Sequence, residues 1–368
     1  MSGVTPPART PPIGLVAIGR NEGGRLAACL DSVLGDGAAG RWAGQPAAVV
    51  YVDSGSTDGS VALAEARGAS VVRLDTAVPF TAARARNAGR ERLAELDPSL
   101  ELVQFVDGDC TLVPGWLEAA AAALAADPGA AVACGRRRER HPDATPWNRL
   151  CDMEWDTPVG EADACGGDAV YRLGAFDAVN GFDPTFICGE EPQLCLRLRQ
   201  AGHRVLRIDH EMTLHDADMT SWRQWWKRST RGGWAYAEGA DRYGDLPERY
   251  NVKQARSNWL WGLGAPLAAG LSLLLAALHS VWWLLGAAAV AGGFCLLAFR
   301  VGRHRRARGD RARDARLYGV LTAAGKLPSA VGQLRYLGHK RRGGPATLIE
   351  YKAPAGADAG AAGARSAS

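Results

Sequence analysis

The chain has 368 residues, of which 47% are hydrophobic and 22% are charged, so it can build a sizeable core and wholesale disorder is excluded. The formal net charge of +4 at pH 7 is too small to indicate a nucleic-acid partner, and we expect none. The charge is unevenly distributed, because the stretch from Arg300 to Arg342 holds 13 lysines and arginines against 2 aspartates. The remainder of the chain is therefore mildly acidic.

The eight cysteines contain no CxxC pair, which argues against a zinc or disulfide framework and for a reducing compartment. Near the N-terminus, prolines occupy the place where a secretory signal needs an apolar stretch, so we expect no signal peptide. Residues 1–12 are predicted to be a flexible arm. Residues 353–368, rich in alanine and glycine, are predicted to be a disordered tail.

Short apolar runs alternate with helical patterns over the first 110 residues. Strands are predicted at 13–18, 47–52, 70–74 and 101–106, separated by helices after residue 22, near 59–67 and over 81–96. Strand alternating with helix predicts right-handed crossovers and an α/β fold, Rossmann-like, with a mainly parallel sheet and flanking helices. We place this domain at residues 13–250.

Polar residues follow three of the predicted strands. Asn21 and Glu22 follow the first, Asp53 ends the second, and Asp107 and Asp109 follow the fourth. Because ligands of such sheets bind beyond the carboxyl ends of the strands, we expect these residues to form one site. A dinucleotide or P-loop site is excluded, since the first turn reads GRNEGG and no GxxxxGK[ST] occurs.

The stretch VQFVDGDC places two like charges, Asp107 and Asp109, where an apolar strand ends. Two ionised carboxylates there are costly unless a positive charge offsets them. Mg²⁺ or Mn²⁺ prefers oxygen ligands and is commonly held by carboxylates together with substrate phosphates. The pair therefore predicts a metal–diphosphate site, with an ordinary polar turn as the alternative.

Two long uncharged stretches follow, 259–278 and 281–299, each long enough to cross a bilayer. Basic residues lie on both outer sides, which predicts a transmembrane hairpin at 251–299 with both ends, and the catalytic domain, in the cytoplasm. A buried helical pair within a soluble domain is the alternative. Residues 300–352 are predicted to be a basic cytoplasmic or interfacial segment, with 317–337 lying at the membrane surface.

The motifs VAIGRNE, VVYVDSGSTDGS, ARNAGR, VQFVDGDC, GGDAVYRLGAFDAVNGFD and GEEPQLCLRLRQAG occur in the order typical of family 2 glycosyltransferases with a GT-A fold. The resemblance covers roughly residues 13–230. It implies an inverting transferase that uses a nucleotide-diphosphate sugar and a divalent metal.

Carried over position by position, the resemblance implies nucleotide-sugar contacts at Asn21, Glu22, Asp53, Asp58, Arg86, Asp107, Gly167 and Asp168. Within this set, Asp53 resembles a contact to the base or ribose. Gly167 and Asp168 resemble the loop that meets the donor sugar and the acceptor. Asp107 and Asp109 are similar to the family's DxD element, with Asp109 favoured as the direct metal ligand.

Inverting transfer needs a carboxylate, separate from the metal pair, that takes the proton of the acceptor hydroxyl. Glu190 and Glu191 lie at the start of a predicted helix, where the helix dipole favours carboxylates. The family usually shows Glu-Asp here, with the aspartate as base. The resemblance therefore favours Glu191 and leaves Glu190 open.

His215, just past a predicted strand at 203–208, is a candidate to complete the metal shell, although a lone histidine is more often structural. The stretch QWWKR at 224–228 only partly matches the QxxRW element of processive synthases, which favours transfer of a single sugar. Trp225 and Trp226 are read as a headgroup anchor or as a stacking surface for an acceptor sugar.

The sequence thus predicts a transferase anchored in the cytoplasmic membrane that acts on a sugar or lipid-linked acceptor among the membrane lipids. Two alternatives stay open. The first is a nucleotidyltransferase that makes a sugar nucleotide on a similar sheet. The second is a membrane scaffold whose transferase-like domain no longer catalyses.

Overall fold

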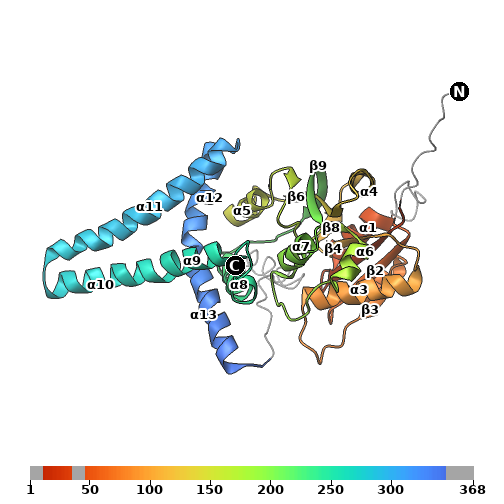
Figure 1. The fold of residues 1–368 in the computed structure, drawn as a ribbon, viewed down its shortest axis with the longest axis horizontal. Coiled ribbons are helices and arrows are strands. Elements are labelled where there is room, and N and C mark those ends of the chain that lie inside the picture. Colours follow the sequence, from red (N-terminus) through yellow and green to blue (C-terminus); the bar gives the residue numbers. More distant parts are fainter. Residues whose placement is uncertain (1–10, 35–45, 345–368) are drawn as a thin grey trace, which may run out of the picture.

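The structure, a computed structural model, describes residues 11–34 and 46–344. The predicted arm at 1–12 lies almost wholly, and the predicted tail at 353–368 wholly, outside the described residues. An α/β domain carries the N-terminal half of the described chain, and a long helical hairpin projects away from it (Figure 1). Two further helices lie between these parts.

The first half of the sheet is parallel, as predicted. Strands β1 (Ile13–Gly19), β2 (Ala48–Asp53), β3 (Ser70–Arg73) and β4 (Leu102–Asp107) lie in the order β3-β2-β1-β4. Helices α1 (Gly24–Leu34), α2 (Ser60–Ala66) and α3 (Ala82–Leu96) connect them. Strands β1 and β4 are buried on both faces, which explains their uninterrupted apolar sequences.

The second half of the sheet is mixed, so the prediction of a mainly parallel sheet is wrong there. It contains β5 (Cys110–Leu112), β6 (Ala130–Glu139), β7 (Gly160–Glu161), β8 (Ala169–Arg172) and β9 (Arg204–His215). Strand β8 is antiparallel to both β4 and β6, and β5 and β7 are antiparallel to β9, whereas β6 and β9 are parallel. Apolar runs reveal that strands exist, but their directions depend on pairing between distant segments.

Four helices accompany these strands: α4 (Trp116–Ala126), α5 (Pro146–Glu154), α6 (Leu173–Ala178) and α7 (Glu190–Gln200). An aromatic cluster joins β4 and β8 to the segment that leads to α7. The ring of Phe105 lies 5.6 Å from that of Tyr171 and 5.2 Å from that of Phe182, both edge to face. This packing holds the loop after β4 and the segment before α7 close together.

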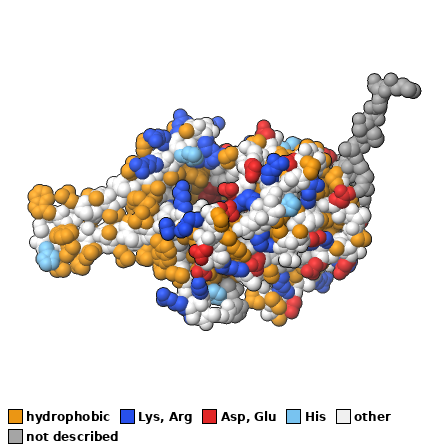
Figure 2. Space-filling view, in the orientation of Figure 1, with side chains coloured by type: hydrophobic (Ala, Val, Ile, Leu, Met, Phe, Trp, Pro, Cys, Tyr) orange, Lys and Arg blue, Asp and Glu red, His pale blue; other side chains and the backbone are white. Residues whose placement is uncertain are grey.

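The hairpin begins at Val252, within a residue of the predicted start at 251, and its second helix ends at Ala307, later than the predicted end at 299. Helix α9 (Val252–Trp259) continues through a π-helical turn (Leu260–Gly264) into α10 (Ala265–Leu278), and a short 3₁₀ turn (Val281–Trp283) leads into α11 (Leu284–Ala307). Hydropathy marked only the apolar part, whereas the helices continue into polar sequence. The segments Val252–Leu278 and Val281–Ala307 are long and apolar enough to cross a membrane, and no part of their apolar windows is buried. Hydrophobic side chains cover the projection in Figure 2.

Helices α12 (Ala312–Ala324) and α13 (Lys326–Arg342) pack on the protein. Helix α12 contacts α11 and α5, and α13 lies against α8 (Trp222–Tyr243). The α8–α13 crossing is close, because a Cβ on Gly332 would lie 2.0 Å from the carbonyl oxygen of Thr230. The segment predicted at the membrane surface, 317–337, therefore has protein partners along its length. It connects the hairpin to the α/β domain.

Candidate active site

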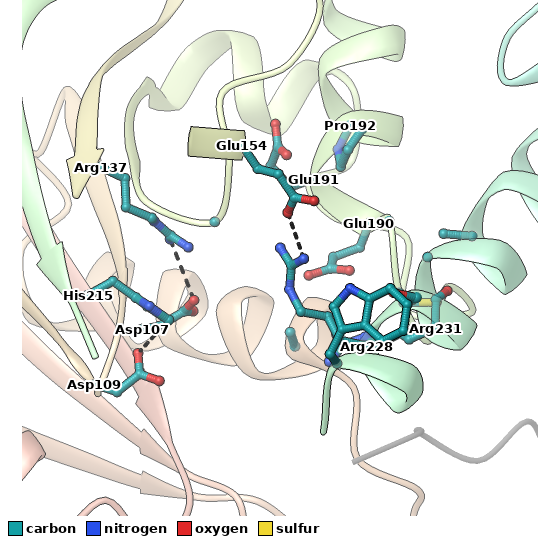
Figure 3. Close-up of a pocket in the computed structure, with 18 of the residues that line it drawn as sticks. Asp107, Asp109, Arg137, Glu154, Glu190, Glu191, Pro192, His215, Arg228 and Arg231 are labelled. Carbon is teal, nitrogen blue, oxygen red and sulfur yellow. Dashed lines mark hydrogen bonds and ion pairs between the residues drawn. The ribbon is translucent and has the colours of Figure 1, made fainter. Parts of the chain in front are cut away.

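A cavity of about 930 Å³ lies at the carboxyl ends of β1 and β4. Its walls come from the loops after these strands, the start of α7, the middle of α8 and the junction of α12 with α13 (Figure 3). The predicted site residues among its lining are Asn21, Glu22, Arg86, Asp107, Asp109, Gly167, Glu190, Glu191 and His215. The remaining three, Asp53, Asp58 and Asp168, lie outside it.

The turn between β4 and β5 presents both aspartates of the DGD stretch to the cavity. The N–H of Gly108 donates a 2.8 Å hydrogen bond to the carbonyl oxygen of Ile18 on the neighbouring strand. A Cβ on Gly108 would lie 3.2 Å from that oxygen, which is tighter than ordinary packing. The glycine therefore allows the turn to lie directly against β1.

Two arginines offset the negative charge of Asp107. Its carboxylate lies 2.8 Å from the guanidinium of Arg86 and 3.7 Å from that of Arg137. Burial alone would lower the pKa of Arg86, but Asp107 and Glu190 raise it above its ordinary value, so this arginine stays charged. Sequence analysis missed Arg137, since nothing distinguishes it within the run GRRRER.

Asp109 and His215 meet because β5 and β9 pair with Cys110 opposite His215. The Nε2 atom of His215 lies 3.5 Å from a carboxylate oxygen of Asp109, and both side chains are buried. On its other side, Nδ1 of His215 lies 3.7 Å from the carboxylate of Glu139. The carboxylate of Asp109, the imidazole of His215 and the thiol of Cys110 lie close enough together to hold one ion, whereas Asp107 lies in a second such group with Cys110 and Asp168. A carboxylate and an imidazole suit Mn²⁺, so Asp109 and His215 fit a divalent metal.

Asp168 does not line the cavity but contacts residues that do. It is fully buried, accepts hydrogen bonds from the N–H of Asp107 (3.1 Å) and the hydroxyl of Thr213 (2.7 Å), and lies 2.7 Å from Arg137. Its neighbour Gly167 does border the cavity. The predicted contact of Asp168 with the donor sugar stays a prediction.

Two of the predicted nucleotide contacts are engaged in local structure. The carboxylate of Asp53 accepts hydrogen bonds from the N–H groups of Gly55 (3.0 Å) and Ser56 (2.9 Å). The carboxylate of Asp58 accepts from the N–H (3.0 Å) and the hydroxyl (2.6 Å) of Ser60, at the start of α2. Both therefore shape the loop after β2, and their ligand contacts stay predictions.

Asn21 and Glu22, after β1, border the cavity directly. Asn21 has a left-handed backbone (φ 55°), and its side-chain oxygen accepts a 2.7 Å hydrogen bond from the N–H of Thr57. This contact joins the loops after β1 and β2. The carboxylate of Glu22 lies 3.0 Å from Arg25.

The two glutamates at the start of α7 have different surroundings. One carboxylate oxygen of Glu190 lies 2.8 Å from Arg86, and the side chain lines the cavity (Figure 3). One oxygen of Glu191 instead accepts from the N–H of Cys165 at 2.7 Å and contacts the thiols of Cys165 (3.0 Å) and Cys195 (3.1 Å).

Burial raises the pKa of Glu191 above its ordinary value, because the carboxylate is removed from water. The Sγ atoms of Cys165 and Cys195 lie 3.5 Å apart beside it. Sequence analysis did not find these two thiols, which are 30 residues apart in the chain. Their contacts tie the loop that carries Gly167 to the start of α7.

The wall next to the hairpin was not predicted. The guanidinium of Arg228 lies 2.6 Å from Glu154 across the cavity, and Trp225 stacks on Trp147 with ring centroids 5.5 Å apart. Trp225, on α8, is thus buried against α5 and is not exposed as a headgroup anchor. Helices α12 and α13 complete this wall with Tyr318, Leu321, Thr322, Gly325, Lys326 and Ser329.

The chain is similar to a known sequence family and to solved structures. Residues 16–174 match the sequence family described as Glycosyl transferase family 2. Mannosyltransferase PcManGT from Pyrobaculum calidifontis, solved in complex with GDP-Man and Mn²⁺, is 19% identical and has a TM-score of 0.60, with 89% of this chain and 88% of that chain covered. S. aureus TarS 1-349 is 14% identical with a TM-score of 0.47, covering 85% of this chain and 90% of that chain.

The fold is thus that of an α/β domain of the GT-A type with a mixed sheet. With the match of residues 16–174 to the glycosyl transferase family 2 model, the protein is a glycosyltransferase. The alternative of a nucleotidyltransferase is thereby set aside.

Proposed function

We propose that the protein is a metal-dependent, inverting glycosyltransferase that moves a sugar from a nucleotide-diphosphate donor to a lipid-linked saccharide at a membrane. One observation carries the proposal: a single cavity holds Asp107, Asp109 and His215 at one end and Glu190 at its middle, and its other end reaches the hairpin. Metal-type ligands, a separate carboxylate and a wall at the foot of the hairpin are the three parts that this reaction needs.

The donor would lie at the strand ends, with its nucleotide toward Asn21 and Glu22 and its diphosphate toward Asp107. Arg86 and Arg137 supply positive charge beside Asp107. PcManGT, which shares the fold, was solved with GDP-Man and Mn²⁺, and this supports a nucleotide-sugar donor here. Asp107, Asp109 and His215 would hold Mg²⁺ or Mn²⁺, which supplies charge that offsets the charge of the departing diphosphate.

We propose Glu190 as the general base, although the resemblance favours Glu191. Glu190 lines the cavity, and among the described residues Arg86 contacts only one of its carboxylate oxygens. Glu191 is engaged by a backbone N–H and two thiols. In the reaction, Glu190 takes the proton of the acceptor hydroxyl while the oxygen of that hydroxyl bonds to the anomeric carbon of the donor sugar. The bond to the diphosphate breaks on the opposite face, which inverts the configuration.

The hairpin supports a membrane acceptor. Its two apolar helices are exposed in the structure, and a solvated apolar surface of that extent is costly unless lipid covers it. Arginines and a histidine in the last turn of α11 place positive charge next to the apolar span. This arrangement favours a cytoplasmic catalytic domain at the membrane surface.

Thermal shift of the purified protein with a panel of nucleotide-diphosphate sugars, with and without Mn²⁺, tests the donor and the metal together. We expect at least one donor to stabilise the protein only when Mn²⁺ is present. The same donor should then label membrane lipid extracts in a transfer assay. If no donor binds with Mn²⁺, the protein is the catalytically inactive scaffold, and the proposed reaction is wrong.

A further inference from the structure

Lys326, the first residue of α13, lies at the wall of the cavity next to the hairpin. Its ammonium group carries three N–H donors, and in the described residues only one has a protein acceptor, the side-chain oxygen of Asn258 at 3.0 Å. Burial lowers the pKa of Lys326, and no carboxylate contributes to the shift. The structure thus holds a half-buried cation without a counter-ion of its own.

Asn258 adds a second donor at the same place. The residue is 1% exposed, and its side-chain nitrogen has no hydrogen-bond partner among the described residues. The orientation of the amide is determined, because the Lys326 ammonium needs the amide oxygen as its acceptor. A buried N–H group without an acceptor is costly, so this pair of donors indicates a ligand that brings acceptor oxygens.

The surrounding wall is polar and not acidic. Ser229, Thr322, Ser329 and Arg231 belong to the lining, and Glu154, a carboxylate of the lining, is paired with Arg228. Glu190 is held by Arg86 further in. Charge at the hairpin end of the cavity therefore favours an anion.

This end of the cavity adjoins the foot of the hairpin. A Cβ on Gly262, in the π-helical turn, would lie 2.0 Å from the carbonyl oxygen of Lys326, so α13 begins in direct contact with that turn. A second hollow, wholly within the hairpin, begins two residues after Asn258. It is lined by Leu260, Trp261, Ala265, Ala289, Val290 and Gly293. An anionic group at Lys326 and an apolar chain along the hairpin can therefore belong to one molecule.

We propose that Lys326 and Asn258 bind the phosphate that links a lipid to its saccharide in the acceptor. The proposal rests on the proposed function, and it adds the substrate class, a prenyl-type lipid phosphate or diphosphate. With the phosphate at Lys326 and the lipid along the hairpin, the saccharide extends inward, and its terminal hydroxyl reaches Glu190. Lys326 thus selects the linking group and takes no part in the proton transfer.

Binding to the full-length protein in detergent micelles tests the site, with three probes compared by calorimetry. Geranylgeranyl phosphate carries both the lipid and the anion, geranylgeraniol carries only the lipid, and inorganic phosphate carries only the anion. We expect geranylgeranyl phosphate to bind at least about tenfold more tightly than either of the others. The reason is that a charge-assisted hydrogen bond from Lys326 to the phosphate contributes more than about 1.4 kcal/mol, the free energy that corresponds to a factor of ten.

Lys326→Gln should remove the preference for geranylgeranyl phosphate over geranylgeraniol. Asn258→Asp, which places a carboxylate at the same position, should do so as well. Lys340→Gln is the matched control, because Lys340 lies on the same helix but pairs with Asp241 outside the cavity. A cooperative thermal melt with the native circular-dichroism spectrum reports that each variant is folded, whether or not a nucleotide sugar binds.

The proposal is overturned if Lys326→Gln and Asn258→Asp bind geranylgeranyl phosphate as tightly as the native protein. It is also overturned if inorganic phosphate binds as tightly as geranylgeranyl phosphate, since the site would then serve a free anion. These results are separate from the donor screen. A native protein that prefers the lipid phosphate yet binds no nucleotide sugar would refute the proposed transferase and leave the lipid site in place.

Discussion

The carboxylate of Glu190 lies 2.8 Å from the guanidinium of Arg86. The same guanidinium lies 2.8 Å from Asp107, so one arginine joins the glutamate at the start of α7 to the aspartate at the end of β4. The side chain of Arg86 is only 3% exposed, and the contacts on both sides hold it in one place. The separation of the proposed base from the proposed metal ligand is therefore set by the fold.

Glu190→Gln should lower the turnover number by about 10²–10⁴-fold, because the amide cannot accept the proton of the acceptor hydroxyl. Donor binding should stay within a few-fold of native, since Arg86 and the metal ligands remain. Glu191→Gln is the matched control and should retain most of the turnover. Steady-state transfer and donor titration separate the two effects, and the reverse ranking of the variants would make Glu191 the base.

The stability of the protein should depend on pH through Glu191. Burial raises the folded-state pKa of this carboxyl above its unfolded value, so the folded state binds a proton more tightly than the unfolded state does. The stability linked to this group is present at low pH and is lost as pH rises through the folded-state pKa. Compared with Glu191→Gln, the native protein should therefore lose melting temperature as the pH rises above the ordinary pKa of a glutamate. A difference in melting temperature that is constant with pH would contradict this.

Metal removal should abolish transfer. EDTA should eliminate activity and excess Mn²⁺ should restore it, and Asp109→Ala should be inactive at every Mn²⁺ concentration. His215→Ala should need a higher Mn²⁺ concentration, by about 10-fold or more, because an imidazole ligand is lost. His210→Ala is the control, since His210 packs near Trp116 outside the cavity. An unchanged Mn²⁺ requirement in His215→Ala would remove His215 from the metal shell.

The exposed apolar surface of the hairpin should hold the protein on membranes. Leu271 and Leu285 are 57% and 63% exposed, and arginine at such positions costs about 2.5–3.5 kcal/mol each in a bilayer. The double variant Leu271→Arg/Leu285→Arg should shift the protein from the membrane to the soluble fraction in a flotation assay. Leu96→Arg, at an exposed leucine of the α/β domain, should have no effect. Equal flotation of both variants would show that the hairpin is not the anchor.

The close crossing of α8 and α13 should be intolerant of side chains. Gly332→Ala would place a Cβ 2.0 Å from the carbonyl oxygen of Thr230, which forces the helices apart and should cost about 1–3 kcal/mol of stability. Gly338→Ala, on the same helix, meets only the end of Arg342 at 3.7 Å and should be neutral or slightly stabilising. Chemical denaturation compares the two. Similar stabilities would mean that the crossing is looser than described.

Much of the α/β core could be read from the sequence. The runs at 13–18 and 101–106 are uniformly apolar because β1 and β4 are buried on both faces, and their ends fall within a residue of the predicted ends. The two aspartates beside Gly108 were identified for the same reason, since charge directly after a buried strand is unusual. The uncharged stretches of the hairpin were equally clear, because their composition alone sets them apart.

The tertiary structure decided the rest. Arg137, Cys165 and Lys326 come from segments far apart in the chain and carry no local pattern, yet each contacts the site or its supports. The direction of β8, the packing of α12 on α5 and the packing of α13 on α8 depend on contacts between distant segments. Hydrophobic periodicity reports which face of an element is buried. It does not report which partner buries that face, and that partner determines which polar groups share one cavity.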